Sequence, residues 1–375
     1  MVDVALIGVG KMGLSHLSMV RAHPDVTVTG VCDSAAYVLD VLGKYTGLPT
    51  FTDVTTMLDS VHVDAIVIAT PTASHASLVR DALDRGLHVF CEKPLSLSGP
   101  DSTELAQLAA DLDRVTGVGY HNRHVGAFRE VKKLLDAGAI GRVTHALAES
   151  YGPVVLKPKG STWRSRRSSG GGCLYDYAAH PLDLLAWYFG EAESAGGSVI
   201  NSIFSAETDD EVYSLLRFRE NISAHLSVNW SDESQRKMTT KISVWGTAGR
   251  IVADRQECQV FLRDTAPAVP GYDRGWNVRY TTELTEPVWF YLRGEEYSAQ
   301  LDEFIRAVDS AVRTGSAAPT VNSFATAAVT DRVIDMIERD ASGAPAAEAT
   351  PRPVAERSAP ARRRLFGRRS ERAAS

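Results

Sequence analysis

A glycine pattern directly after the first apolar run constrains the fold of this chain more than any other feature. Val2–Ile7 is short and mostly apolar, and it is followed without a gap by Gly8-Val9-Gly10-Lys11-Met12-Gly13. Such a run is typical of a parallel strand that is buried on both faces. A strand, a glycine-rich turn and a helical segment in this order begin a doubly wound parallel sheet, so we expect an α/β fold.

The same alternation continues through the first third of the chain. Apolar runs that we interpret as further strands lie at 26–32, 65–69, 88–91 and 115–119, and segments with helical spacing lie at 76–85 and 101–112. Because strands alternate with helices, the expected fold class is a Rossmann-type, doubly wound parallel sheet. We place this first domain at residues 1–122.

The pattern changes after about residue 143. Alternating polar and apolar residues predict strands at 212–219, 222–230 and 238–245, and helical spacing predicts helices at 175–189, 297–313 and 323–338. Such alternation indicates a large, mainly antiparallel open sheet with one covered face. We therefore expect a second, α+β domain at 123–340 that binds substrate and oligomerises, with its last helices packed back on the first domain.

Residues 341–375 differ in composition from both domains. Ala, Pro, Ser, Glu and Arg dominate this stretch, which includes Arg362-Arg363-Arg364 and Arg368-Arg369. We interpret it as a disordered basic tail. A contact of these arginines with an anionic surface or a nucleic acid is the alternative.

Composition argues against several classes of protein. The 375 residues carry a net charge of -6, whereas nucleic-acid binders usually carry a basic field. No apolar run approaches the roughly 20 residues of a membrane span, and the N-terminus lacks the features of a signal peptide.

No Cys-x-x-Cys pair occurs, so we expect neither a metal site nor disulfides and place the protein in the reducing cytoplasm. The four separated cysteines are Cys32, Cys91, Cys173 and Cys258.

The glycine pattern also carries a functional prediction. Gly8, Gly10 and Gly13 permit a tight turn, the approach of a pyrophosphate to the backbone, and the packing of the helix on the sheet. Asp33 ends the second strand twenty positions after Gly13, where its carboxylate would bind the adenosine ribose and repel a 2′-phosphate. We therefore expect NAD as the cofactor, with NADP as the second choice. A flavodoxin-like or non-binding sheet, which needs glycine only for turns, is the alternative.

Two further turns leave central strands at their carboxyl ends, where open parallel sheets bind ligands. One is Ala69-Thr70-Pro71-Thr72-Ala73-Ser74-His75, and the other is Glu92-Lys93-Pro94. His75 could contact the dinucleotide, or it could be a cap or packing residue. Lys93 could point its ammonium toward the nicotinamide end, or it could be an ordinary surface lysine.

The segment from Ser169 to His180 combines a triple glycine with two candidate catalytic residues. Asp176 and His180 are four positions apart, so on a helix they share one face and can touch. A carboxylate beside an imidazole orients the ring and raises its basicity, as a general base requires. An ordinary pair on a helix surface is the alternative. Pro181 should kink this helix, because it removes one backbone hydrogen bond.

Together these motifs resemble the glucose-fructose oxidoreductase, inositol dehydrogenase and rhizopine-catabolism family, abbreviated Gfo/Idh/MocA. The resemblance covers roughly Met1–Arg339, and four signatures occur in the family's order: the glycine turn, the proline-histidine turn, the Glu-Lys-Pro tripeptide and the glycine-rich segment before the second-half helix. It implies that Lys93, Asp176 and His180 form the catalytic set. It also implies a cis peptide bond before Pro94.

The resemblance further implies contacts with the cofactor and the substrate. Residues expected to contact the cofactor are Gly8, Val9, Gly10, Lys11, Met12, Gly13, Asp33, Ser34, Ala69, Thr70, Pro71, His75, Glu92 and Lys93. Residues expected to contact the substrate are Lys93, Arg123, Tyr151, Trp163, Arg164, Asp176 and His180. The sequence departs from the family pattern at His121 and Asn122, and again at Arg166 and Arg167, where many members carry Asp-Pro.

The expected function follows from this set. The resemblance implies an NAD(P)-dependent oxidoreductase that moves a hydride between nicotinamide and a secondary hydroxyl or ketone of a sugar, cyclic polyol or nucleotide-linked sugar. His180 would take the hydroxyl proton, Asp176 would hold the imidazole, and Lys93 would stabilise negative charge on the oxygen. A homodimer or homotetramer is expected. A glycosidase-type reaction through transient oxidation and a non-catalytic, dinucleotide-binding regulator are the alternatives.

Three arginines before the triple glycine suggest a property of the substrate. Arg164, Arg166 and Arg167 could together clamp a phosphate or carboxylate, because guanidinium groups bind such anions with two hydrogen bonds. A solvated basic loop is the alternative.

Overall fold

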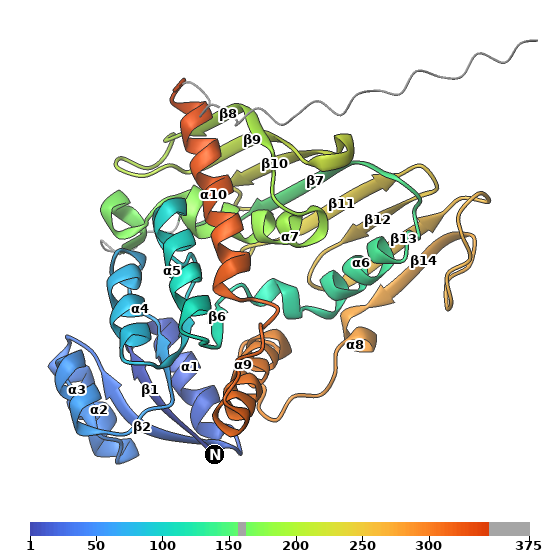
Figure 1. The fold of residues 1–375 in the computed structure, drawn as a ribbon. Coiled ribbons are helices and arrows are strands. Elements are labelled where there is room, and N and C mark those ends of the chain that lie inside the picture. The colour runs from blue at the N-terminus through green and yellow to red at the C-terminus, as the bar shows by residue number, and fades with distance from the viewer. Residues whose placement is uncertain (157–162, 345–375) are drawn as a thin grey trace, which may run out of the picture. The chain divides into compact units, whose positions relative to one another are not determined.

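The computed structural model describes residues 1–156 and 163–344, so most of the stretch interpreted as a tail lies outside the described residues. The first part of the chain forms a six-stranded parallel sheet with the order β3-β2-β1-β4-β5-β6 (Figure 1). The strands are β1 (Val2–Ile7), β2 (Val26–Cys32), β3 (Thr50–Phe51), β4 (Ala65–Ile68), β5 (His88–Cys91) and β6 (Thr116–Val118). The expected doubly wound fold is confirmed, and its strand order reverses between β1 and β4.

The helices of this part begin and end where local side chains satisfy the backbone. They are α1 (Lys11–Ala22), α2 (Ala36–Thr46), α3 (Val54–Ser60), α4 (His75–Asp84) and α5 (Gly99–Asp111). The side chains of Asp53 and Ser98 cap α3 and α5 by accepting hydrogen bonds from backbone N–H groups of the first turn. α2 ends at Gly47, whose φ of 69° is left-handed.

A second sheet of eight strands follows, with the order β14-β13-β12-β11-β7-β10-β9-β8. Its strands are β7 (Val143–Tyr151), β8 (Ser194–Asn201), β9 (Glu211–Arg217), β10 (Ser223–Asn229), β11 (Lys241–Gly246), β12 (Gly249–Ala253), β13 (Glu257–Leu262) and β14 (Gly275–Tyr280). β7 and β10 pair in parallel, whereas the other neighbours pair antiparallel. The expected, mainly antiparallel sheet is therefore confirmed.

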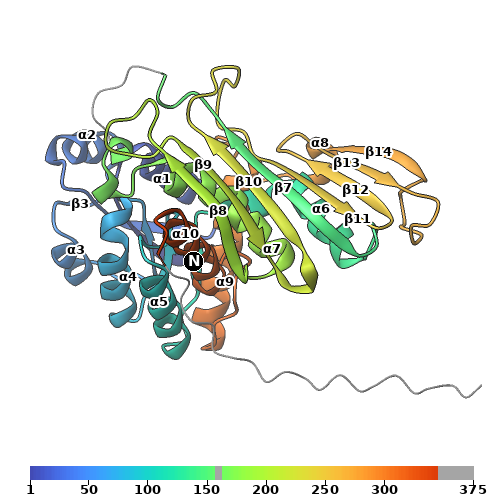
Figure 2. The same ribbon diagram turned by 90° about the horizontal axis from the view of Figure 1, so that it is seen from above.

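Helices cover one face of the second sheet. α6 (Gly126–Asp136) packs on β12 and β13, and α7 (Ala179–Phe189) packs on β7 and β10 (Figure 2). Along β7, Ala146, Ala148 and Ser150 are buried, whereas the residues between them are only partly buried. Because successive side chains of a strand point to opposite faces, the face away from α6 and α7 is the open one.

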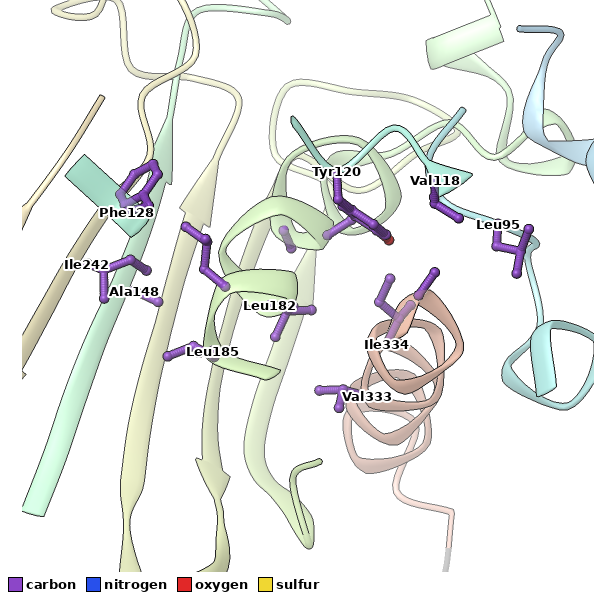
Figure 3. Packing of buried hydrophobic residues seen from close by; sticks show 14 of the residues in the cluster. Leu95, Val118, Tyr120, Phe128, Ala148, Leu182, Leu185, Ile242, Val333 and Ile334 are labelled. Atoms are coloured by element: carbon purple, nitrogen blue, oxygen red, sulfur yellow. The ribbon is translucent and has the colours of Figure 1, made fainter. Parts of the chain in front are cut away.

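The last helices return to the first sheet. α9 (Glu295–Thr314) follows the short α8 (Thr281–Leu284) and buries Leu301, Phe304 and Val308 in one cluster with side chains of β1. α10 (Phe324–Ala341) packs against α5 and α7, and Figure 3 shows its Val333 on the side that faces Leu182 of α7. Both helices therefore contact the first sheet, α9 at β1 and α10 at β6. Among the described residues, no helix is both long and apolar enough to cross a membrane.

Candidate active site

The glycine turn after β1 has the shape of an anion cradle. A side chain at Gly8 would meet the Ala69 carbonyl at 2.8 Å, and one at Gly13 would overlap the Gly8 carbonyl oxygen, so both positions require glycine for close packing. A Cβ at Gly10 would have no atom of the described residues within 4 Å, so open space lies beside the first turn of α1. No side chain in this part of the chain caps the helix. Uncapped N–H groups at a helix N-terminus next to open backbone suit a pyrophosphate, so these residues fit a dinucleotide.

Asp33 lies at the end of β2, beside the glycine turn. Its Oδ2 accepts a hydrogen bond from the backbone N–H of Val9 at 2.7 Å, and its Oδ1 accepts one from Ala35 at 2.8 Å. The carboxylate therefore holds the turn and the strand end together. The sequence predicts that the Asp33 carboxylate, at this end of β2, binds the ribose hydroxyls of the cofactor.

His75 is a packing residue rather than a surface ligand. Its side chain is 1% exposed, and its ring nitrogens lie 2.9 Å from the Pro94 carbonyl oxygen and 3.0 Å from that of Thr70. Burial lowers the pKa of this imidazole, so the ring is neutral at pH 7. The ring thus joins the turn at Thr70 to the turn at Pro94, which agrees with the packing role, and its contact with the cofactor stays a prediction. The Lys93–Pro94 peptide bond is cis, as expected.

Glu92 joins the tripeptide to the glycine-turn helix. Its Oε1 lies 2.6 Å from Nε2 of His16, which is buried on α1. Burial alone would raise the pKa of Glu92, but His16 and Lys93 together lower it. The carboxylate is therefore charged and fixed beside the lysine.

Lys93 and Asp176 meet although they are 83 positions apart. The Lys93 ammonium donates hydrogen bonds to Oδ1 of Asp176 at 3.0 Å and to its backbone carbonyl at 2.7 Å. The two side chains are 11% and 5% exposed. The alternative of an ordinary surface lysine is therefore wrong. Asp176 lies in a π-type turn, Leu174–Ala178, which directly precedes α7 and Pro181.

Asp176 binds two cations instead of the imidazole. Its second oxygen, Oδ2, accepts a hydrogen bond from Nε of Arg164 at 2.7 Å. Burial favours the neutral acid, but the charges of Lys93 and Arg164 hold the pKa of Asp176 at about 2. The expected contact between Asp176 and His180 is therefore wrong, because full positive charges compete for the carboxylate better than a neutral ring does.

His180 faces the same region from the first turn of α7. Its ring lies edge-on to those of His121 and Tyr120, with centroid distances of 5.0 Å and 6.3 Å. Its buried Nδ1 has no hydrogen-bond partner in the described part of the chain. Burial and the positive charges of Lys93 and Arg255 hold the pKa of His180 well below its usual value. The imidazole is therefore neutral at pH 7 and can accept a proton.

Sequence analysis missed three neighbours of this centre. Tyr297, in the first turn of α9, stacks on His121 at 4.4 Å, and its hydroxyl lies 3.4 Å from the ring nitrogen Nε2. Arg255, between β12 and β13, is paired with Glu296 of α9. The sequence marks His121 only as a departure from the family pattern. The sequence gives no signal for Arg255 or Tyr297. Both reach this centre only through the fold, in which Arg255 pairs with Glu296 of α9.

Two residues expected to contact the substrate have other partners. Arg123 is 3% exposed and binds both carboxylate oxygens of Asp183, at 2.8 Å and 2.6 Å. It forms a buried ion pair within the protein. Tyr151 alternates with the buried residues of β7 and donates a hydrogen bond to Ser227 at 2.8 Å, which places it on the open face of the second sheet. Both side chains thus have partners within the protein, and their contact with a substrate stays a prediction.

The three arginines before the triple glycine do not gather around one site. Arg164 lies over the ring of Trp163 at 4.7 Å and binds Asp176, whereas Arg167 binds Glu338 of α10 at 3.2 Å. Arg166 is exposed. Because two of the three already hold carboxylates of the protein, the expected anion clamp has no support in these contacts.

Comparison with known proteins relates this geometry to a described family. Residues 2–120 match the model of an oxidoreductase family with an NAD-binding Rossmann fold, and residues 128–252 match the GFO/IDH/MocA C-terminal domain. Myo-inositol 2-dehydrogenase of Thermotoga maritima is 28% identical over 82% of this chain and 88% of its own length. Levoglucosan dehydrogenase of Pseudarthrobacter phenanthrenivorans is 26% identical over 74% and 80%. A solved levoglucosan dehydrogenase in complex with NADH has the same fold, with a TM-score of 0.78 and 23% identity over 91% of this chain and 97% of that one.

Proposed function

Because the chain belongs to the Gfo/Idh/MocA family of NAD-binding oxidoreductases, we propose that it is a dehydrogenase of a sugar or cyclic polyol. It would transfer a hydride between the nicotinamide and a secondary hydroxyl or ketone of that substrate. The observation that carries the proposal is the meeting of Lys93, from the first sheet, with Asp176, from the turn that leads to His180. Relatives that act on inositol and levoglucosan support the substrate class.

His180 acts as the general base. Its pKa is well below the usual value because of burial, Lys93 and Arg255, so the ring is neutral before the reaction and can accept the hydroxyl proton. A bound NAD would supply the acceptor for the hydride on the carbon that carries this hydroxyl. Proton and hydride thus leave in separate directions, and the hydroxyl becomes a ketone.

Lys93 stabilises the oxygen from which the proton leaves. Two of its three N–H groups are used by Asp176, so one remains for the substrate oxygen. A positive charge in a site shielded from water lowers the energy of an oxygen that is becoming negative. Asp176 therefore serves catalysis by anchoring Lys93, rather than by orienting His180.

The cofactor is held by the first sheet. The open backbone at Gly10 and the N-terminus of α1 would bind the pyrophosphate, and Asp33 would bind the adenosine ribose. A carboxylate at this position disfavours the 2′-phosphate of NADP, so we expect a preference for NAD.

A substrate panel tests the proposal. Purified protein is mixed with NAD or NADP and with inositols, free sugars and anhydrosugars, and the absorbance of the reduced nicotinamide is followed. We expect reduction of NAD with at least one of these compounds. Absence of reduction with every polyol and sugar would contradict the proposed activity.

Two variants test the assigned roles. Lys93→Met and His180→Ala should each lower kcat by about 10²-fold or more while the Kd for NAD changes less than about threefold. Lys133→Met, at an exposed lysine of α6, is the matched control and should keep full turnover. Turnover like that of the wild type in Lys93→Met or His180→Ala would remove that residue from the catalytic set.

We also propose that the open face of the second sheet joins two copies of the chain. A shallow cavity of about 640 Å³ on this face is lined by His145, Tyr213 and Trp245, among others. Trp245 stacks on His145 at 4.5 Å, and Trp276 on β14 is 58% exposed. Burial of such aromatic area would stabilise a homodimer. Sedimentation as a monomer at micromolar concentration would contradict this proposal.

A further inference from the structure

Arg164 has no place in the mechanism described above, yet it touches the same carboxylate as Lys93. Its Nε donates to Oδ2 of Asp176 at 2.7 Å, while Nζ of Lys93 donates to Oδ1 at 3.0 Å. One buried carboxylate is therefore shared by two cations. We propose that Arg164 is a positioning residue that acts through Asp176, taking up part of the carboxylate's charge so that Lys93 stays available to the substrate oxygen. This inference rests on the proposed dehydrogenase function.

The local backbone fixes Arg164 in this place. A side chain at Gly171 would overlap the carbonyl groups of Arg164 and Arg166, so only glycine lets the turn close against them. The backbone N–H of Gly171 donates to the Arg166 carbonyl at 3.0 Å. The guanidinium also lies over the Trp163 ring at 4.7 Å. The turn therefore directs Arg164 toward Asp176, although its side chain is 42% exposed.

The balance of charge around Asp176 gives the physical reason. The titratable groups that face this carboxylate are Lys93, Arg164, Tyr177 and Cys173. Burial raises the pKa of Tyr177 and of Cys173, so both are neutral at pH 7. Two positive charges therefore meet one negative charge at a carboxylate that is 5% exposed, where water screens the contact with Lys93 weakly and that with the 42% exposed Arg164 more strongly. Without Arg164, the whole carboxylate charge would act on Lys93.

Direct binding of the substrate by Arg164 predicts different kinetics. A substrate ligand contributes to the ground state and the transition state alike, so its loss raises KM and leaves the pH profile unchanged. A residue that acts through Asp176 changes the ionic state of the catalytic centre. Its loss lowers kcat and leaves KM nearly unchanged, and Asp176 itself then takes up a proton at a higher pH.

The kinetic test uses Arg164→Met, which keeps the apolar stem and removes the charge. With the sugar or polyol that the wild type oxidises fastest, we expect kcat and kcat/KM each to fall about tenfold, while KM changes less than about threefold. Arg164→Lys should restore part of both effects, because it returns the charge. Arg166→Met, at an exposed arginine of the same turn, is the matched control and should behave like the wild type.

A second measurement needs no turnover. Carboxyl carbons of aspartate are labelled with ¹³C in the full chain with NAD bound, and the Asp176 signal is assigned with Asp176→Asn. In the wild type the signal should remain that of a carboxylate down to about pH 4, since the pKa is about 2. In Arg164→Met the signal should titrate about two pH units higher. Acetylation of Lys93 by acetic anhydride should also become several-fold slower.

The outcomes separate this inference from the proposed function. A raised KM with an unchanged kcat and an unchanged Asp176 titration would make Arg164 a substrate ligand and overturn the inference. If the wild type reduces no cofactor with any substrate, the proposed function fails. The titration of Asp176 then still decides whether Arg164 controls its ionisation.

Discussion

Replacing Asp331 with asparagine should make the stability of this protein depend less on pH between about 4 and 7. Asp331 lies on α10 and is 2% exposed. Its Oδ2 accepts hydrogen bonds from the Ser102 hydroxyl at 2.6 Å and from the Ser96 backbone at 3.3 Å, and its Oδ1 lies 3.4 Å from the Tyr120 hydroxyl. Burial raises its pKa from 3.8 to about 7, although these hydrogen bonds act in the opposite direction.

The size of the effect follows from this shift. The folded state binds the Asp331 proton more tightly than the unfolded state by about three pH units, and each unit corresponds to about 1.4 kcal/mol. The resulting stabilisation is fully present below the unfolded pKa of 3.8 and is lost as the pH rises through about 7. By pH 8, ionisation of this one group should therefore cost about 4 kcal/mol of unfolding free energy. Asparagine resembles the neutral acid in shape and does not titrate.

Urea unfolding at several pH values between about 5 and 8 measures the effect. Tryptophan fluorescence gives the unfolding free energy of the wild type and of Asp331→Asn, and the difference between them is compared across pH. The difference is the right quantity, because buried histidines such as His88 and His124, whose pKa values burial lowers, add an opposite pH dependence to both proteins. We expect the variant to gain about 2–3 kcal/mol relative to the wild type from pH 5 to pH 8.

A flat difference would refute the reasoning. If the two proteins differ by a constant amount, within about 1 kcal/mol, then Asp331 does not change its ionisation in this range. Asp84→Asn, at an exposed carboxylate near the end of α4, is the control and should give a flat difference. A slope of the same size in the control would assign the effect to net charge rather than to burial.

Three further predictions follow from the contacts. Asp33→Ala should weaken NAD binding and reduce the discrimination against NADP, as measured by Kd for both; an unchanged preference would contradict its assignment to the ribose. In Gly13→Ala the added methyl group meets the Gly8 carbonyl, so Tm and NAD affinity should both fall, and wild-type values would show that the turn can yield. Arg123→Met leaves Asp183 buried without its cation and should lower the unfolding free energy by about 3–5 kcal/mol; a raised KM with unchanged stability would instead make Arg123 a substrate ligand.

The elements that sequence predicted well are those that local chemistry determines. β1, β2 and β5 have the predicted bounds, because each is a short apolar run that ends at a turn or a polar residue. The glycine turn was also predicted, since close packing at Gly8 and Gly13 admits only glycine. In contrast, β3 has only two residues and β8 contains two adjacent glycines, so neither shows a clear alternation.

Partners of charged side chains could not be predicted in this way. The spacing of Asp176 and His180 allows a contact, but Lys93 and Arg164 arrive from other parts of the chain and bind the carboxylate instead. Arg123 was placed near the substrate by resemblance, whereas Asp183 on α7 binds it. A pattern along the sequence gives the position of a charge, and only the fold determines which opposite charge comes closest.

Because Asp176 binds Lys93, it does not orient His180, the proposed general base. An imidazole that donates to a carboxylate is oriented and made more basic, but Nδ1 of His180 has no hydrogen-bond partner among residues 1–156 and 163–344. Its ring is oriented instead by edge contacts with His121 and Tyr120. A base weakened by burial takes a proton readily only from a hydroxyl that is itself made more acidic. In the proposed mechanism the nearby ammonium of Lys93 supplies that effect, so this mechanism depends on the charge of the lysine more than on the basicity of the histidine.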